Sequence, residues 1–365
     1  MPPRPAGSGV TTSATSVARP SVWRHRVARF GGDAVSVRVV PRSVALSVGF
    51  VVVIVAAGVA TLTTGDYSIP VGDVVRALLG HGDGGTDFVV NTLRLPRLLT
   101  GLLVGAALAL SGAIFQSVSG NVLGSPDILG FTTGSATGAV IVLLVLRGDA
   151  TQASLGALAG GVVTGAAVYL LAYRRGLAGA RLVLVGIATA ALLNAVNSYL
   201  ITRATLADAV TAQVWLIGSL NSRGWEQARP LAVALVVLVP IGIYQGRRLA
   251  YLELGTDTAK ALGVDVERCR LTLILAAAAL AATATAAAGP IGFVALTAPP
   301  LARWLTAAPS PPLVPTALAG AALVTVSDLA AQRLFAPTQL PVGVATAAIG
   351  GIYLAVLLVR QRRPA

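Results

Sequence analysis

Long apolar runs dominate this sequence and leave few folds open to it. A bilayer span needs about 20 mostly apolar residues, and ten stretches reach or approach that length. Two of them, Leu231–Tyr244 and Ile291–Leu305, are short and contain Gly or Pro, so either could be broken or buried in protein. The ten stretches are Val44–Thr63, Leu98–Val118, Ile128–Leu146, Ser154–Tyr173, Leu182–Thr202, Leu231–Tyr244, Leu271–Ala288, Ile291–Leu305, Leu313–Ala331 and Pro341–Val359.

The composition agrees with a membrane environment. Charged residues make up 11% of the 365 residues, whereas soluble domains usually carry about 25%. The 40 Gly suit helices that pack closely in lipid, and the single cysteine, Cys269, cannot form an internal disulfide. We therefore predict an all-α, polytopic integral membrane protein with about ten transmembrane helices.

The first 42 residues differ from the rest of the chain. They are rich in Pro, Ser, Thr and Arg, and their apolar content is too low for a packed core. The first 30 residues contain no apolar run followed by a small-residue cleavage site, so we expect no cleaved signal peptide. We predict a disordered basic tail at residues 1–42 and one transmembrane domain at residues 43–363.

The charge distribution predicts the orientation. The chain has 27 Lys and Arg against 14 Asp and Glu. Ten spans put both termini on one side, and most of the basic residues then fall on that side. Because cytoplasmic segments of membrane proteins are enriched in positive charge, we expect both termini in the cytoplasm, with the chain in the cell membrane. The basic excess reflects this topology, and we reject a nucleic-acid role.

One strongly polar insert, residues 251–270, interrupts the apolar runs. We predict a short helix at Asp257–Leu262, capped by Thr256 or Asp257 and ended by Gly263. Asp265 would cap a second turn that runs into Arg270 and the next span. Long connections with their own structure are usually functional. The insert is therefore either an amphipathic helix resting on lipid or a docking element for a cytoplasmic partner.

A set of motifs then appears in a fixed order. They are "RLPRLLTGLLVGAALALSGAIFQ" (Arg94–Gln116), "PDILG" (Pro126–Gly130), "GIATAALLNAV" (Gly186–Val196), "WLIGSLN" (Trp215–Asn221), "LGTDTAKALGVDVER" (Leu254–Arg268), "GPIGFVALTAP" (Gly289–Pro299) and "LPVGVATAAIGG" (Leu340–Gly351). In these motifs the chain resembles the FecCD-type permeases, membrane subunits of ABC importers for ferric siderophores, haem and vitamin B12.

The resemblance implies the type II importer fold of the vitamin B12 importer, with ten helices per permease. It also implies a second permease subunit, two cytoplasmic ATPases that bind the ATP, and an extracytoplasmic binding protein. Ferric siderophore is the commonest cargo in the family and is the expected one, with haem or cobalamin as alternatives. The insert would then be a coupling loop seated in a groove of the ATPase. Its expected coupling residues are Leu254, Gly255, Thr256, Asp257, Ala259, Lys260, Leu262, Gly263, Val264 and Arg268.

The resemblance also implies a docking surface for the binding protein. Arg94 and Arg97 flank Pro96 at the outer end of a span, where they would meet acidic residues of the binding protein or anchor lipid headgroups. Asp328 lies near the outer end of another span, and Arg333 follows five residues later. Asp328 could equally serve helix packing, since ionisable groups within spans need a partner or a function.

Four positions depart from the family pattern. Pro300 replaces a usual histidine, Val122 a usual proline, and Gly120 and Gln332 usual arginines. Two interpretations are open: a sister subunit supplies the missing groups in a heterodimer, or the positions reflect ordinary drift. Separately, four small or neutral polar residues could line the translocation path or serve helix packing: Gly134, Ser135, Asn194 and Asn197.

Other functional classes fit the sequence less well. A secondary transporter would need ionisable groups inside its spans, and nearly all the spans lack them. A membrane enzyme would need paired catalytic groups, and a metal site more than two distant histidines and one cysteine. Lys260 is followed by Ala261, not by the Ser or Thr of a P-loop. We therefore expect no enzyme activity, no metal and no directly bound cofactor.

Overall fold

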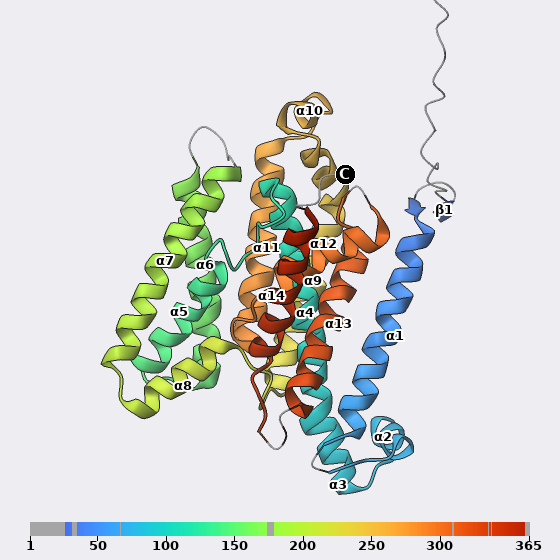
Figure 1. The fold of residues 1–365 in the computed structure, drawn as a ribbon, viewed down its shortest axis with the longest axis vertical. Coiled ribbons are helices and arrows are strands. Elements are labelled where there is room, and N and C mark those ends of the chain that lie inside the picture. The colour runs from blue at the N-terminus through green and yellow to red at the C-terminus, as the bar shows by residue number, and fades with distance from the viewer. Residues whose placement is uncertain are drawn as a thin grey trace, which may run out of the picture.

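A computed structural model of the chain describes residues 26–30, 35–65, 67–173, 179–308, 310–334, 336 and 338–361. Long helices run side by side along one axis of the molecule (Figure 1). They are α1 (Pro41–Thr63), α4 (Leu95–Ser119), α6 (Ala150–Ala172), α7 (Gly179–Arg203), α9 (Trp225–Glu253), α11 (Val266–Ala288), α13 (Leu313–Arg333) and α14 (Val342–Gln361).

Shorter elements lie before or between these helices. They are β1 (Arg26–Phe30), β2 (Val35–Val39), α2 (Val71–Leu78), α3 (Gly84–Asp87), the π-helix η1 (Phe88–Arg94), α5 (Phe131–Leu144), α8 (Leu206–Ile217), α10 (Thr256–Ala261) and α12 (Val294–Thr306). Helices α2, α3 and α8 were not expected from the sequence, because each is too short to span a membrane.

Each of the ten expected spans coincides with a helix. Among the described residues, seven helices are long and apolar enough to cross a membrane. The two doubtful spans differ from each other. Helix α9 is continuous over 29 residues despite Pro230 and Pro240, whereas α12 has 13 residues and starts only at Val294, after a non-helical segment. The possible break is therefore seen before α12 and not in α9.

Part of the expected tail is a β-hairpin. Strands β1 and β2 pair antiparallel, with Arg26 opposite Val39 and Phe30 opposite Val35. The alternation of Val with Ser or Arg in β2 suits a strand, and α1 then begins at Pro41, where proline is favoured. This differs from the disorder expected for residues 1–42, of which residues 1–25 and 31–34 lie outside the described part.

Helix α4 is the centre of the bundle and contacts α9, α11, α12 and α13. Two glycines allow this. A Cβ at Gly105 would overlap the backbone carbonyl of Gly320 on α13, and a Cβ at Gly112 that of Ala295 on α12. Glycine thus lets backbones touch where any side chain would separate them.

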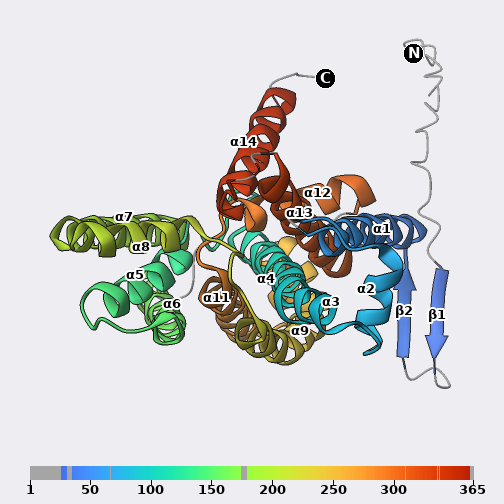
Figure 2. The ribbon, with the colours of Figure 1, turned by 90° about the horizontal axis from the view of Figure 1, so that it is seen from below.

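Helices α5 to α8 form a group beside this bundle (Figures 1 and 2). Helix α5 packs on α6, and α6 on α11. Helix α10 lies at the same end of the molecule as the start of α1 and the end of α14, and α2 and α3 lie at the opposite end (Figure 1). These are called the α10 end and the α2 end below.

Candidate functional sites

A basic cavity of about 610 Å³ opens at the α2 end. Its walls come from the end of α1, from η1 and the start of α4, from residues 222–224 before α9, and from the end of α13 and the residues after it. Four arginines belong to this lining: Arg94, Arg97, Arg223 and Arg333. The cavity therefore brings together three of the docking residues expected from the sequence.

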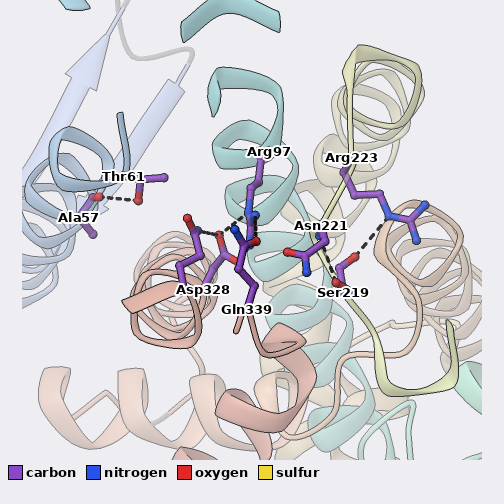
Figure 3. A network of polar contacts seen from close by, with 9 residues as sticks. Ala57, Thr61, Arg97, Ser219, Asn221, Arg223, Asp328 and Gln339 are labelled. Atoms are coloured by element: carbon purple, nitrogen blue, oxygen red, sulfur yellow. Dashed lines mark hydrogen bonds and ion pairs between the residues drawn. The ribbon is translucent and has the colours of Figure 1, made fainter. Parts of the chain in front are cut away.

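The fourth expected residue, Asp328, lies next to the cavity in an ion pair with Arg97 (Figure 3). Arg97 Nε lies 3.0 Å from Asp328 Oδ2, and Arg97 Nη2 lies 2.8 Å from Oδ1. Gln332 Nε2 donates to Oδ2 at 2.7 Å, and Arg97 Nη1 donates to Gln339 Oε1 at 3.3 Å. Gln332 thus occupies the i+4 position from Asp328 as a neutral donor.

Arg94 connects helices instead of lying in a loop. Pro96 would be well placed in the first turn of a helix, but η1 runs directly into α4, so Arg94 is already helical. Arg94 Nη1 donates to the carbonyl oxygen of Leu62 at 2.7 Å, and Nη2 donates to that of Tyr67. The guanidinium therefore holds the end of α1 and the following loop against η1.

The other two arginines of the cavity are held less tightly. Arg333 Nε and Nη2 are buried without a hydrogen-bond partner. Arg223 Nε donates to the Ser219 carbonyl oxygen at 3.3 Å, and burial lowers the pKa of this guanidinium. Arg223 was not predicted as a site residue. The signal available was an arginine two residues after the "WLIGSLN" motif, in a connection between two apolar runs.

The polar insert at the α10 end forms the expected short helix. Gly255 precedes α10 with φ of 103°, and Gly263 follows it with φ of 80°; only glycine adopts such angles readily. The predicted cap by Thr256 or Asp257 is wrong, because Gly255 holds the N-cap position. Asp265 caps the next helix as expected: it accepts from Arg268 N at 3.2 Å in the first turn of α11.

The expected coupling residues divide into two faces. Ala259 is buried, whereas Leu254 and Leu262 are 62% and 55% exposed. Lys260, Gly263 and Arg268 are also exposed. The insert therefore presents two large apolar side chains and two cations outward, while Ala259 attaches it to the bundle.

A neutral polar cavity of about 430 Å³ lies between α5, α7 and α8. Asn194, Asn197, Thr132 and Gln213 belong to its lining, and Asn197 Oδ1 is buried without a hydrogen-bond partner. Two expected path residues, Gly134 and Ser135, are not part of this lining. They are buried between α5 and α6, where a Cβ at Gly134 would overlap the Thr164 side chain.

The connection from α4 to α5 carries a perturbed carboxyl group. Burial raises the pKa of Asp127 to about 6, partly opposed by hydrogen bonds from the Thr132 side chain and the Phe293 backbone. No cluster of three His, Cys, Asp or Glu suited to a metal ion occurs among the described residues. His81 is described and exposed, and His25 lies outside the described part.

Apolar helices around a buried central helix, with polar sites at both ends and between the helix groups, define a multi-pass membrane transport protein. The family model of the FecCD transport family matches residues 51–360, and the chain belongs to that family. It is therefore an ABC importer permease, a transport subunit and not an enzyme, built on the type II importer fold.

Curated relatives cover nearly the whole chain. The ferric enterobactin transport system permease protein FepG of Escherichia coli is 45% identical over 309 residues, which cover 85% of this chain and 94% of the relative. The achromobactin transport system permease protein CbrC of Dickeya dadantii is 36% identical over 312 residues, which cover 85% of this chain and 89% of the relative.

A solved structure shows the same fold. It is described as an inward-facing conformation of a metal-chelate type ABC transporter. Its TM-score is 0.78 at 31% identity, and the match covers 87% of this chain and 99% of that chain.

Proposed function

We propose that this permease imports a ferric siderophore delivered by an extracytoplasmic binding protein and driven by a separate ATPase. The observation that carries the proposal is the 45% identity with a ferric enterobactin permease. Relatives whose names specify achromobactin and iron hydroxamate, at 36% and 33% identity, support the same cargo class. Haem and cobalamin are the alternative cargoes.

The proposed assembly contains two permeases, two ATPases and one binding protein. Helix α7 leaves Leu184, Ile187, Leu192 and Tyr199 largely exposed, and such apolar surface suits either lipid or the second permease. We favour a heterodimer, because the family positions at Gly120, Val122, Pro300 and Gln332 differ from the usual residues. The absent groups would come from the sister subunit.

In the proposed orientation the α10 end and both termini face the cytoplasm. The positive-inside asymmetry supports it. The exposed side chains of Leu254, Leu262, Lys260 and Arg268 would enter the ATPase groove, and Leu254–Arg268 would carry ATPase closure to the permease. The glycines at both ends of α10 give this element a defined bend on each side.

The α2 end would then receive the binding protein. Arg94, Arg97, Asp328 and Arg333 form or adjoin the basic cavity, which would attract acidic side chains of that partner. Within this set the pairing of Arg97 with Asp328 offsets both charges, so we assign the net attraction mainly to Arg333. Arg94 and the Arg97–Asp328 pair shape the surface on which it lies.

The translocation path would run past the neutral cavity of α5, α7 and α8. Asn194 and Asn197 would offer hydrogen bonds to the chelate without a fixed charge. Gly134 and Ser135 would support this wall from behind by holding α5 against α6. A weakly polar wall suits a bulky chelate that must pass without tight binding.

Uptake in whole cells tests the proposal. Cells lacking this chain are given ⁵⁵Fe-labelled enterobactin, ⁵⁵Fe-labelled ferrichrome, labelled haem or labelled cobalamin, with and without the restored gene. We expect only iron–siderophore uptake to depend on the chain and on ATP. Dependence of haem or cobalamin uptake alone would assign the permease to that cargo, and uptake that persists without any ATPase would refute the importer class.

A further inference from the structure

One carboxylate at the α10 end connects three helices. Glu253, the last residue of α9, accepts from Arg303 Nη2 on α12 at 3.0 Å and 3.1 Å through its two oxygens. It also accepts from Ser117 Oγ on α4 at 2.6 Å. Because all three groups meet at one side chain, α4, α9 and α12 cannot move apart here without breaking charge-assisted hydrogen bonds.

The position of Glu253 relative to α10 gives these bonds a functional meaning. Two residues, Leu254 and Gly255, separate Glu253 from α10. Thr256, the first residue of α10, accepts a hydrogen bond from Arg270 Nη2 on α11 at 3.0 Å. The start of α10 is therefore tied to α11 directly, and to α4 and α12 through Glu253.

We infer that Glu253 is the positioning residue that passes a displacement of α10 to α4 and α12, through Arg303 and Ser117. The inference rests on the proposed docking of α10 to an ATPase. A force on α10 reaches α9 through a covalent connection of two residues, but it reaches α4 and α12 at this end through the carboxylate. These two helices are joined by the backbone contact at Gly112 and Ala295.

The surroundings of Glu253 suit a contact that changes during the ATP-driven transport cycle. The side chains of Arg303 and Glu253 are 35% and 20% exposed, so the ion pair is partly buried. A cavity of about 540 Å³ lies beside it, and its lining includes Gly120, Val122 and Ser310. The three helices thus have free space next to the junction into which they can shift.

A merely structural ion pair would stabilise the fold but would not pass a nucleotide-dependent displacement of α10 to α4 and α12. One experiment distinguishes this structural role from the proposed positioning role. The permease is purified with its ATPase in a Cys269→Ser background with Val122→Cys, which lies beside the junction. The maleimide labelling rate of that cysteine is measured without nucleotide and with ATP and vanadate. We expect the nucleotide to change the rate severalfold, and Glu253→Gln to abolish this change while the ATPase still co-purifies.

Two further variants complete the design. The reversed pair, Glu253→Arg with Arg303→Glu, should restore part of the nucleotide response. Arg76→Gln, which removes an exposed ion pair with Asp73 at the α2 end, should leave the response unchanged. A Glu253→Gln complex that responds like the unaltered protein overturns the inference alone. An unaltered chain that neither binds an ATPase nor responds to nucleotide overturns the proposed function as well.

Discussion

Arg97 and Asp328, 231 positions apart in the sequence, form a two-point ion pair between α4 and α13 at 3.0 Å and 2.8 Å. Their side chains are 14% and 6% exposed. The pair lies at the α2 end of two helices whose backbones touch at Gly105 and Gly320. The charges that resembled a docking surface in the sequence are thus largely committed to each other.

Breaking this pair should destabilise the protein. Removing one partner of a buried ion pair leaves an uncompensated charge, which typically costs about 3–5 kcal/mol. We expect Asp328→Asn to lower the thermal midpoint in detergent clearly, and Arg97→Met with Asp328→Leu to recover much of the loss. Asp73→Asn, which breaks the exposed pair with Arg76, is the control and should change the midpoint little. Equal midpoints for Asp328→Asn and the control would contradict the structural role.

Arg333 should affect docking and not stability. Arg333 Nε and Nη2 have no hydrogen-bond partner, so Arg333→Gln removes the charge without breaking a hydrogen bond of either nitrogen. An exposed ion pair contributes about 0.2–1 kcal/mol, and we expect association with the binding protein to weaken about two- to fivefold at low salt. The difference should vanish at high salt because screening removes the attraction. Arg76→Gln is the matched control at the same end, and an unchanged dissociation constant for Arg333→Gln would refute this role.

The close approach of α4 and α12 should not tolerate a side chain. A Cβ at Gly112 would overlap the Ala295 carbonyl, and overpacking of this kind typically costs about 1–3 kcal/mol. We expect Gly112→Ala to lower the thermal midpoint or the yield of folded protein. Gly49→Ala on α1, where a Cβ meets nothing within 4 Å, should have no such effect. Similar midpoints for the two variants would show that the helices can separate freely.

The turn after α10 should be required for coupling. Gly263 has φ of 80°, and its N–H donates to the Lys260 carbonyl oxygen at 2.9 Å. Proline removes this N–H and requires φ near −65°, so Gly263→Pro should uncouple ATP hydrolysis from uptake in proteoliposomes. Gly263→Asn should keep coupling, because asparagine tolerates the left-handed region. Normal transport per ATP in the proline variant would count against the coupling role of this loop.

Asp127 should make stability depend on pH. Burial raises its pKa from 3.8 to about 6, so the folded protein binds this proton more tightly than the unfolded chain does. Stability should therefore rise as the pH falls from about 7 towards 4. We measure the thermal midpoint at pH 7.5 and at pH 5. We expect Asp127→Asn to lack the increase in midpoint that Asp127 contributes at the lower pH. Asp83→Asn serves as the control, and an identical pH profile for Asp127→Asn would show that burial does not perturb this group.

The main elements of this protein follow from its amino-acid sequence. Each apolar run lies in a helix, because the bilayer core offers the backbone no water and each span must bond internally. The sequence placed the insert at the same end as both termini because six spans precede it and four follow it, and both numbers are even. Gly263 ended α10 as expected, since this backbone angle is nearly specific to glycine.

Which helices are central and which polar residues meet depends instead on how the helices pack against one another. Helices α1 and α4 belong to similarly apolar segments, yet 17% of the span window is buried for α1 and 72% for the segment containing α4. Hydropathy cannot separate them, because lipid tails and a protein interior are equally apolar. The pairings of Arg97 with Asp328 and of Glu253 with Arg303 depend on which helix faces meet. Glycine contacts between distant segments set those faces, and no local pattern in the chain encodes them.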